Sequence, residues 1–179
     1  MELIVNVLQL LIMAGLLFLL LRAGLGKVTT TSANSDSKAE MLGEAETITQ
    51  QLLLHVQAEW RADIKHALYS RMLQLNLGGG HFLDFAHHEI LEHKLKVIEL
   101  QGRLLGLKKR LLHVSPNSEL KRLFAEVESW EEPNPKNYTE ESDPEEIHRK
   151  ALEDTELVRT HIENTLGQAL AGLMAGLER

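Results

Sequence analysis

A long apolar run near the N-terminus divides the chain into parts that suit different solvents. Residues 3–21 read LIVNVLQLLIMAGLLFLLL, nineteen residues without a charged side chain. As an α-helix this run reaches about 28 Å, close to the hydrocarbon thickness of a bilayer, and satisfies its own backbone hydrogen bonds there. We therefore predict a single transmembrane anchor with its juxtamembrane segment over residues 1–28, in contact with the lipid bilayer through residues 3–21.

The competing interpretation of this run is a cleaved signal peptide. A signal peptide carries a positive n-region, an apolar region of about 7–15 residues and a small-residue cleavage site. Here Glu2 is the only charged side chain before the run. Arg22 and Lys27 follow the run closely, and positive residues favour the cytoplasmic side. The expected location is a cell membrane, either inner or plasma membrane, crossed once, with the N-terminus outside and the C-terminal domain cytoplasmic.

Two polar residues, Asn6 and Gln9, lie inside the run on one helical face. A polar side chain in lipid favours a neighbouring helix that can bond it. Contact with other subunits of a membrane complex, or with a second copy, is one interpretation of these residues. The other is that both lie near the lipid headgroups and contact water.

Beyond the anchor, helical signals dominate. Residues 29–36 are small and polar, which predicts a flexible tether. No later stretch alternates as a half-buried strand does. The predicted helices cover about residues 37–76, 81–114, 116–130 and 144–178, and an acidic, proline-containing loop covers 131–143. The predicted fold class is all-α: a transmembrane helix, then a long antiparallel helical hairpin within a coiled-coil-like bundle of three to four helices over residues 37–179.

Local signals predict where these helices begin and end. Ser37 begins a capping box with Glu40, and Ser115 and Asp143 are each followed by a proline that suits a first helical turn. The three glycines 78–80 end the first helix, because they lose too much backbone entropy to stay helical. A short glycine loop between two long helices makes those helices antiparallel neighbours.

The clearest pattern is a seven-residue repeat over residues 81–114. Apolar residues recur in two columns three residues apart for more than four heptads, which is the a/d pattern of packed helices. The columns are Leu83, Ile90, Val97, Leu104 and Leu111, and Ala86, His93, Leu100, Leu107 and Val114. A third column, Leu91, Ile98, Leu105 and Leu112, widens the stripe beyond a two-stranded seam, so we expect a helix inside a bundle.

The first and last predicted helices also carry apolar stripes at helical spacing. The first stripe consists of Met41, Ala45, Ile48, Leu52, Val56, Trp60, Ile64, Leu68 and Leu75. The last consists of Ile147, Ala151, Val158, Ile162, Leu166, Ala169, Leu173 and Leu177. Together the stripes look wider than one small bundle needs, and this surplus is the main sequence argument for a protein partner.

Charge is unevenly distributed. Residues 126–146 hold nine acidic side chains against Lys136, which predicts either a solvated loop that braces the bundle or a docking loop for a basic partner. The basic run 108–110 could contact anionic headgroups if that helix end points back to the membrane. We expect no nucleic-acid binding, because the net charge is −7 and aromatic residues make up 4% of the chain.

Nine histidines make metal binding the main chemical alternative. His81, His88 and Glu92 share one face with Asp84 and Glu99, but this face lies opposite the apolar columns. A polar solvent face is therefore the favoured interpretation. The HExxH arrangement of zinc proteases is missing, because Glu92 rather than a histidine follows His88 by four residues.

His93 differs from the other histidines because it occupies a d position in the apolar seam. We interpret it as a satisfied core histidine or as a register or pH-sensitive device. The E-x-x-H spacing of a di-iron bundle occurs once, from Glu145 to His148, but Glu145 belongs to a capping turn. Phosphate loops and nucleophile motifs are missing from the sequence. We therefore predict no metal site, no cofactor, no catalytic residue and no enzyme.

The C-terminal stretch 166–177 is apolar nearly all round, and Gly172 and Gly176 allow another helix to approach closely. We expect this stretch to be buried against the first two helices or to dock another subunit. The predicted function is a membrane-anchored scaffold, adaptor or accessory subunit of a membrane complex, with no small-molecule substrate identified. The alternative is a histidine-rich metal- or haem-binding bundle at the membrane.

Overall fold

The computed structural model describes residues 34–114 and 116–179. This part of the chain is helical and contains no strand, which confirms the all-α prediction for it. The predicted anchor, with Asn6 and Gln9, lies outside the described residues. The elements are α2 (Asn34–Gln74), α3 (Gly80–Val114), α4 (Ser118–Glu128), α5 (Pro144–Ile162), the π-helical segment η1 (Glu163–Gly167) and α6 (Gln168–Glu178).

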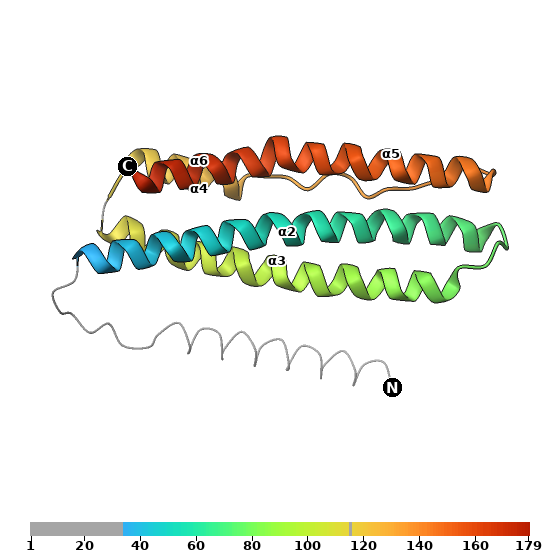
Figure 1. Ribbon diagram of the computed structural model, residues 1–179, viewed down its shortest axis with the longest axis horizontal. Helices are drawn as coiled ribbons and strands as arrows, with labels where there is room; N and C mark the ends of the chain where they lie inside the picture. The colour runs from blue at the N-terminus through green and yellow to red at the C-terminus, as the bar shows by residue number, and fades with distance from the viewer. Residues whose placement is uncertain (1–33, 115) are drawn as a thin grey trace, which may run out of the picture. The chain divides into compact units, whose positions relative to one another are not determined.

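Helices α2 and α3 form the predicted antiparallel hairpin (Figure 1). Helices α5, η1 and α6 follow one another without a break and run along the hairpin as a third long rod. The short helix α4 packs against α6. Residues 130–143 run back along the bundle as an extended segment (Figure 1). The fourth position of the bundle is therefore filled by a helix over part of its length and by extended chain over the rest.

The end of α2 corrects the predicted stop at the three glycines. Asn76 adopts a left-handed conformation, with φ of 58°. The Leu77 amide donates to the Met72 carbonyl and the Asn76 amide to the Leu73 carbonyl, the bond pair of a Schellman motif. Asparagine tolerates this backbone because its short polar side chain suits the left-handed region. The helix thus stops before the glycines: Gly78 and Gly79 form the turn with positive φ, and Gly80 begins α3.

Two predicted helix starts also differ. Helix α2 begins at Asn34, so residues 34–36 of the predicted tether are helical, and the predicted cap Ser37 lies inside the first turn. Polar and acidic residues are compatible with a first turn because of the helix dipole, so this stretch supports a helix as well as a tether. Helix α4 is capped by Asn117, whose side chain accepts from the Glu119 amide at 2.9 Å, rather than by Ser115.

The predicted start of the last helix is confirmed. The Asp143 carboxylate accepts from the Glu145 amide at 3.1 Å, and Pro144 occupies the first helical position, where its missing amide hydrogen costs no bond. The helix continues through η1, where the Thr165 hydroxyl donates to the His161 carbonyl at 2.7 Å.

The π-helical segment explains one error in the predicted stripe. The buried residues Ile162, Leu166 and Leu170 are each four apart, a spacing that would rotate away from the core in a regular helix. The wider turn of η1 has more residues per turn, so it removes this rotation and keeps all three residues on the buried side. As a result Leu170 is buried, whereas Ala169, which was predicted for the stripe, is only partly buried.

One hydrophobic core joins all the helices, with Phe124, Ile48, Leu107 and Ile147 among its fully buried side chains. The predicted stripe of α2 is buried except for Leu75, which is partly buried. In α3 the core members come from the two predicted columns: Ala86, Val97, Leu100, Leu104, Leu107 and Leu111. The other members of the columns are less buried: Leu83, Ile90 and His93 are half-buried, and Val114, the last residue of α3, is 64% exposed.

The third column of α3 is not in this core. Leu91, Ile98 and Leu105 are exposed, and Leu112 is only partly buried. The bundle has no helix on that side of α3 among the described residues (Figure 1). The prediction that this column packs inside the bundle is therefore wrong within the residues that the structure describes. Within the described residues, no helix combines the length and apolar character needed to cross a membrane.

Candidate functional site

The outer face of α3 is the most unusual surface of the bundle. It consists of Leu91, Leu95, Ile98, Gly102, Leu105 and Gly106, which share one side of the helix at spacings of three and four residues. The four large side chains are 47%, 67%, 57% and 46% exposed. At 100° per residue they point nearly opposite the buried columns of the same helix. Helix α3 thus has two apolar sides, and the bundle covers one of them.

The two glycines of this face have no structural reason within the described chain. A Cβ built at Gly102 or at Gly106 meets no atom within 4 Å. A glycine inside a helix costs about 1 kcal/mol relative to alanine, because it loses more backbone entropy on folding. Both positions therefore weaken α3 without allowing any contact in the bundle. Glycine at an exposed helix face does allow the backbone of another helix to come close.

The charged side chains of α3 divide into those with an ion partner in the bundle and those on or beside the outer face without one. Six of its ten charged residues have an ion partner: Glu89, Lys94, Lys96, Glu99, Lys108 and Arg110. Asp84, Glu92, Arg103 and Lys109 are exposed and form no ion pair with any described residue. These four charges lie on or beside the outer face. Two residues of the basic run 108–110 are used inside the chain, where Lys108 pairs with Glu128 at 2.7 Å and Arg110 pairs with Glu44.

A pocket borders the outer face. It has a volume of about 360 Å³ and opens between α2, α3 and the segment that follows α4. Its walls include Val56 of α2, Gly102 and Leu105 of α3, and Trp130. The Trp130 indole donates to the Thr165 hydroxyl at 3.0 Å, which anchors this wall to η1. The pocket lining is mainly apolar. Its charged residue, Glu128, pairs with Lys108.

The structure places His93 beside a histidine that the sequence analysis did not single out. His55 of α2 and His93 of α3 lie with their Nδ1 atoms 3.1 Å apart, and both are half-buried. Burial lowers the pKa of His55 below 6.5, and neighbouring His93 and Lys96 lower it further, against the opposite effect of Glu92 and Glu99. The pair bonds best when one ring donates and the other accepts, so at least one ring is neutral.

The residues considered as possible metal ligands do not converge. His81, His88 and Glu92 are exposed, and His88 Nδ1 lies 2.9 Å from the Asp84 carbonyl, to which it donates. Over residues 34–114 and 116–179, no group of three or more metal-binding side chains comes together. A second histidine pair, His66 and His87, has ring centroids 6.0 Å apart across the hairpin. Two pairs of histidines thus lie close together between α2 and α3.

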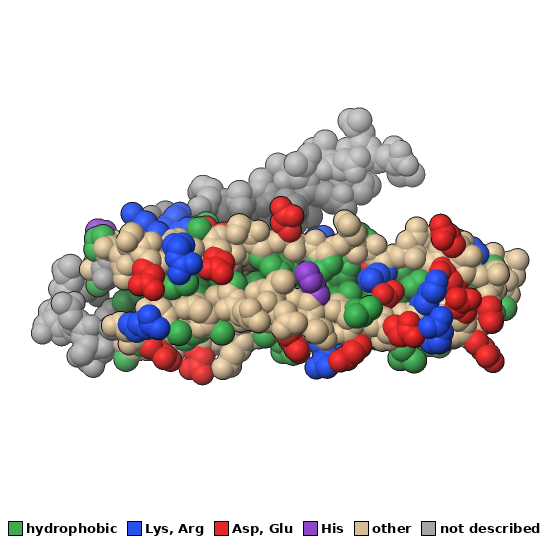
Figure 2. Space-filling model, turned by 90° about the horizontal axis from the view of Figure 1, so that it is seen from above, with side chains coloured by type: hydrophobic (Ala, Val, Ile, Leu, Met, Phe, Trp, Pro, Cys, Tyr) green, Lys and Arg blue, Asp and Glu red, His purple; other side chains and the backbone are tan. Residues whose placement is uncertain are grey.

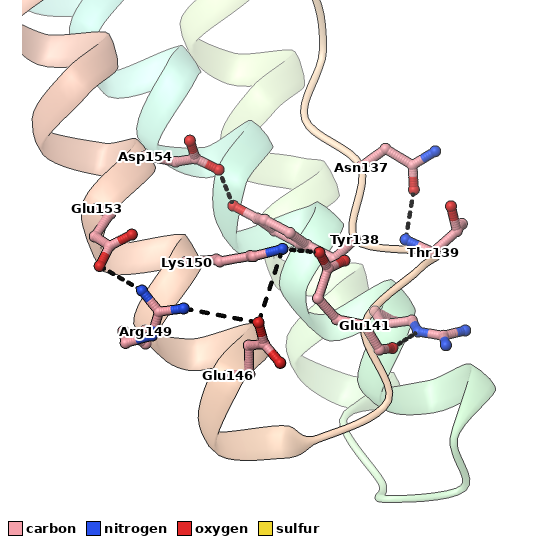
Figure 3. Close-up of polar contacts among 10 residues, drawn as sticks. Asn137, Tyr138, Thr139, Glu141, Glu146, Arg149, Lys150, Glu153 and Asp154 are labelled. Carbon is pink, nitrogen blue, oxygen red and sulfur yellow. Dashed lines mark hydrogen bonds and ion pairs between the residues drawn. The ribbon is translucent and has the colours of Figure 1, made fainter.

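The acidic loop braces the bundle. Tyr138 is 3% exposed, and its hydroxyl donates to Asp154 Oδ2 of α5 at 2.9 Å (Figure 3). Lys136 contacts both α5 and α2. Its ammonium pairs with Asp154 Oδ1 of α5 at 2.8 Å, and its backbone amide donates to Asp63 of α2 at 3.1 Å. Burial raises the pKa of Tyr138 above its ordinary range, and the bonded Asp154 carboxylate adds to this effect. The hydroxyl therefore remains a donor.

The end of the loop is held by charge. The Arg71 guanidinium of α2 donates to the Glu141 carbonyl at 2.6 Å, and Lys150 of α5 pairs with the Glu141 carboxylate (Figure 3). Lys150 holds the pKa of Glu141 below its usual value. Figure 2 shows that acidic and basic side chains are interspersed on this side of the molecule, most densely toward the beginning of α5. The interpretation of the loop as a brace therefore has direct support from these contacts.

Glu59 is a polar exception within the core stripe of α2. It is 7% exposed, and the Lys94 ammonium lies 4.0 Å from its carboxylate. Burial raises the pKa of Glu59, and nearby Glu132 and Asp63 raise it too, whereas Lys94 lowers it. A carboxylate at this position destabilises the folded chain at neutral pH. Sequence periodicity gives no warning of this, because the position is occupied by a common surface residue.

The C-terminal glycines are used inside the bundle. A Cβ at Gly172 would lie 3.9 Å from Leu123 of α4, and a Cβ at Gly176 would overlap the end of that side chain. Leu170, Leu173 and Leu177 of α6 are buried. This stretch is buried as expected, and α4 covers it together with α2, since a Cβ at Gly167 would lie 3.8 Å from Leu53 of α2 whereas Gly172 and Gly176 face Leu123 of α4. The physical reason is that α4 supplies a short apolar ridge, including Leu123, which fits the glycine side of α6.

Comparison with known proteins adds no relative: no family model, no curated protein and no solved structure matches the chain.

Proposed function

We propose that this chain is a membrane-anchored helical scaffold, adaptor or accessory subunit of a membrane protein complex, acting without catalysis through helix–helix contact. The observation that carries the proposal is the outer face of α3. Four exposed large apolar residues in a row are costly in water, since each Å² of apolar surface left exposed forgoes about 25 cal/mol. A stripe of this kind on one helix is typical of a surface that another helix covers.

The membrane part of the proposal rests on residues 3–21, whose length and lack of charge suit a transmembrane helix. A cell membrane with the bundle on the cytoplasmic side agrees with Arg22 and Lys27. The bundle would then be held near the membrane surface, where its effective concentration toward other membrane proteins is high.

The test uses the full chain in native membranes. We expect it to stay in the membrane pellet after alkaline carbonate washing and, after chemical cross-linking, to migrate in an assembly larger than one chain. The substitution Leu95→Glu on the outer face should remove the assembly. The matched control is Leu152→Glu on α5, because Leu152 is 74% exposed and lies on another surface. A monomer with no co-purifying protein, or release by carbonate, would contradict the proposal.

The alternative function, metal or haem binding, is favoured by one observation, the His55–His93 pair with nitrogens 3.1 Å apart. Two imidazoles from facing helices are a start toward a metal site. Metal analysis of the purified full chain tests this alternative. Stoichiometric iron or zinc that is lost on substituting either histidine by alanine would favour it over the scaffold function.

A further inference from the structure

We propose that the outer face of α3 binds the same face of a second copy, with the two α3 helices antiparallel and crossing near Ile98. This inference rests on the proposed function, because it names the partner of the surface that carries that function. It is argued from three properties of the outer face: its side-chain sizes, its charges and its symmetry.

The side-chain sizes are self-complementary. The leucines Leu91 and Leu95 lie before Ile98, whereas Gly102, Leu105 and Gly106 lie after it. When two copies are antiparallel about Ile98, Leu95 of one copy falls opposite Gly102 of the other, and Leu91 falls opposite Leu105, next to Gly106. Leu95 therefore meets a position, Gly102, where a Cβ would find open space in the single chain. The twofold axis repeats both matches, as an isologous interface requires.

The charges follow the same register. Glu92 lies about as far before Ile98 as Arg103 lies after it, on the same flank of the outer face. In antiparallel helix pairs, residues on the same flank face each other across the axis, so Glu92 of one copy meets Arg103 of the other. Asp84 and Lys109 have opposite charges and lie toward the two ends of the outer face. These are the four α3 charges that have no ion partner among the described residues.

The antiparallel direction follows from this distribution. Parallel copies would set glycine against glycine and leucine against leucine, and would place Glu92 of one copy and Arg103 of the other on opposite flanks of the contact. Antiparallel copies set Leu95 against Gly102 and Glu92 beside Arg103, twice in each dimer. From Asp84 to Lys109 the helix rises about 38 Å, so the contact is long enough for a specific helix pair.

Cysteine cross-linking of the full chain in membranes tests the geometry, since the natural sequence contains no cysteine. A disulfide needs Cα atoms about 4.4–6.8 Å apart. Ile98→Cys should cross-link to itself on oxidation. Leu91→Cys alone and Leu105→Cys alone should not, because their copies lie about 21 Å apart, whereas a mixture of the two variants should. Leu152→Cys on α5 is the matched control and should stay uncross-linked.

Charge reversal tests the register independently. Glu92→Arg places two like pairs in the dimer, and the dimer dissociation constant in detergent at low salt should rise about tenfold. Arg103→Glu should do the same. The double variant restores both pairs in reversed order and should return the dissociation constant to near the original value.

Four results would count against the inference. Self-cross-linking of Leu91→Cys and Leu105→Cys would show parallel helices. A second copy that never cross-links at Ile98→Cys, while a different protein is held by the outer face and lost with Leu95→Glu, would replace the partner but keep the proposed function. A chain that stays monomeric and partnerless in membranes would remove both proposals. Charge variants that weaken the dimer without rescue in the double variant would overturn the pairing of Glu92 with Arg103.

Discussion

We expect an added methyl group to change the stability of the fold in opposite directions at two glycines of α6, Gly172 and Gly176. An alanine replaces glycine in a helix with a gain of up to about 1 kcal/mol. At Gly172 the new Cβ would lie 3.9 Å from Leu123 Cδ2, an ordinary contact, so Gly172→Ala should keep most of this gain. At Gly176 the new Cβ would overlap Leu123 Cδ1, and Leu123 is 8% exposed, so the leucine must move within a packed core. Overpacking of this kind costs about 1–3 kcal/mol.

The net expectation is a difference of about 2 kcal/mol between the two variants, with Gly176→Ala the less stable. For a domain of this size that corresponds to roughly 4–8 °C in Tm. Thermal unfolding of the full chain in mild detergent, followed by far-UV circular dichroism at one scan rate, measures the difference. Because both variants change one methyl group on the same helix side, surface and unfolded-state effects nearly cancel.

A double-mutant cycle identifies the cause. Leu123→Ala removes the side chain that Gly176→Ala would strike, so the two substitutions together should be less destabilising than the sum of the single effects. Equal stabilisation by Gly172→Ala and Gly176→Ala, or additive effects with Leu123→Ala, would refute the packing of α4 against α6 described above.

Other groups make further predictions. Glu59→Gln should raise the free energy of unfolding at pH 7 and have less effect near pH 4, because the raised pKa of Glu59 gives stability that is present below the unfolded pKa and lost as pH rises; urea titrations at both pH values check this. Tyr138→Phe should lower stability by about 1–2 kcal/mol, since Asp154 loses a buried donor, and Asp154→Asn should make the loss at Tyr138 smaller in a double-mutant cycle. The lowered pKa of His55 gives stability that is present above pH 6.5 and lost below it, so the wild-type Tm should fall on acidification more than that of His55→Gln. No extra fall in the wild type would show that the His55–His93 contact does not control acid sensitivity.

The candidate site was partly accessible to sequence reasoning. The third column of α3, with Leu91, Ile98 and Leu105, was recognised from its spacing, and a surplus of apolar surface was inferred from it. Its position on the outside could not be inferred, because periodicity gives the width of a stripe but not the number of helices available to cover it. The role of Gly102 and Gly106 was missed, although their spacing of four was a usable signal.

The loop contacts were beyond sequence reasoning for a different reason. Tyr138 and Asp154 lie sixteen residues apart, and nothing in their spacing links them. They meet because the extended segment folds back along α5, so a partner is set by the path of the chain rather than by a local repeat. The same holds for His55 and His93, which come together because the hairpin register aligns α2 with α3.

By itself the sequence determined the helical class, the hairpin and most of the buried residues, because these depend on periodicity and on local signals such as the Asp143 cap. Tertiary structure alone decided how the stripes are shared. It turned the C-terminal glycines inward onto Leu123 and buried Glu59, and it left one apolar side of α3 facing outward. The reason is that the sequence of a helix determines which of its sides are apolar, whereas the number and placement of neighbouring helices determine which of those sides are covered.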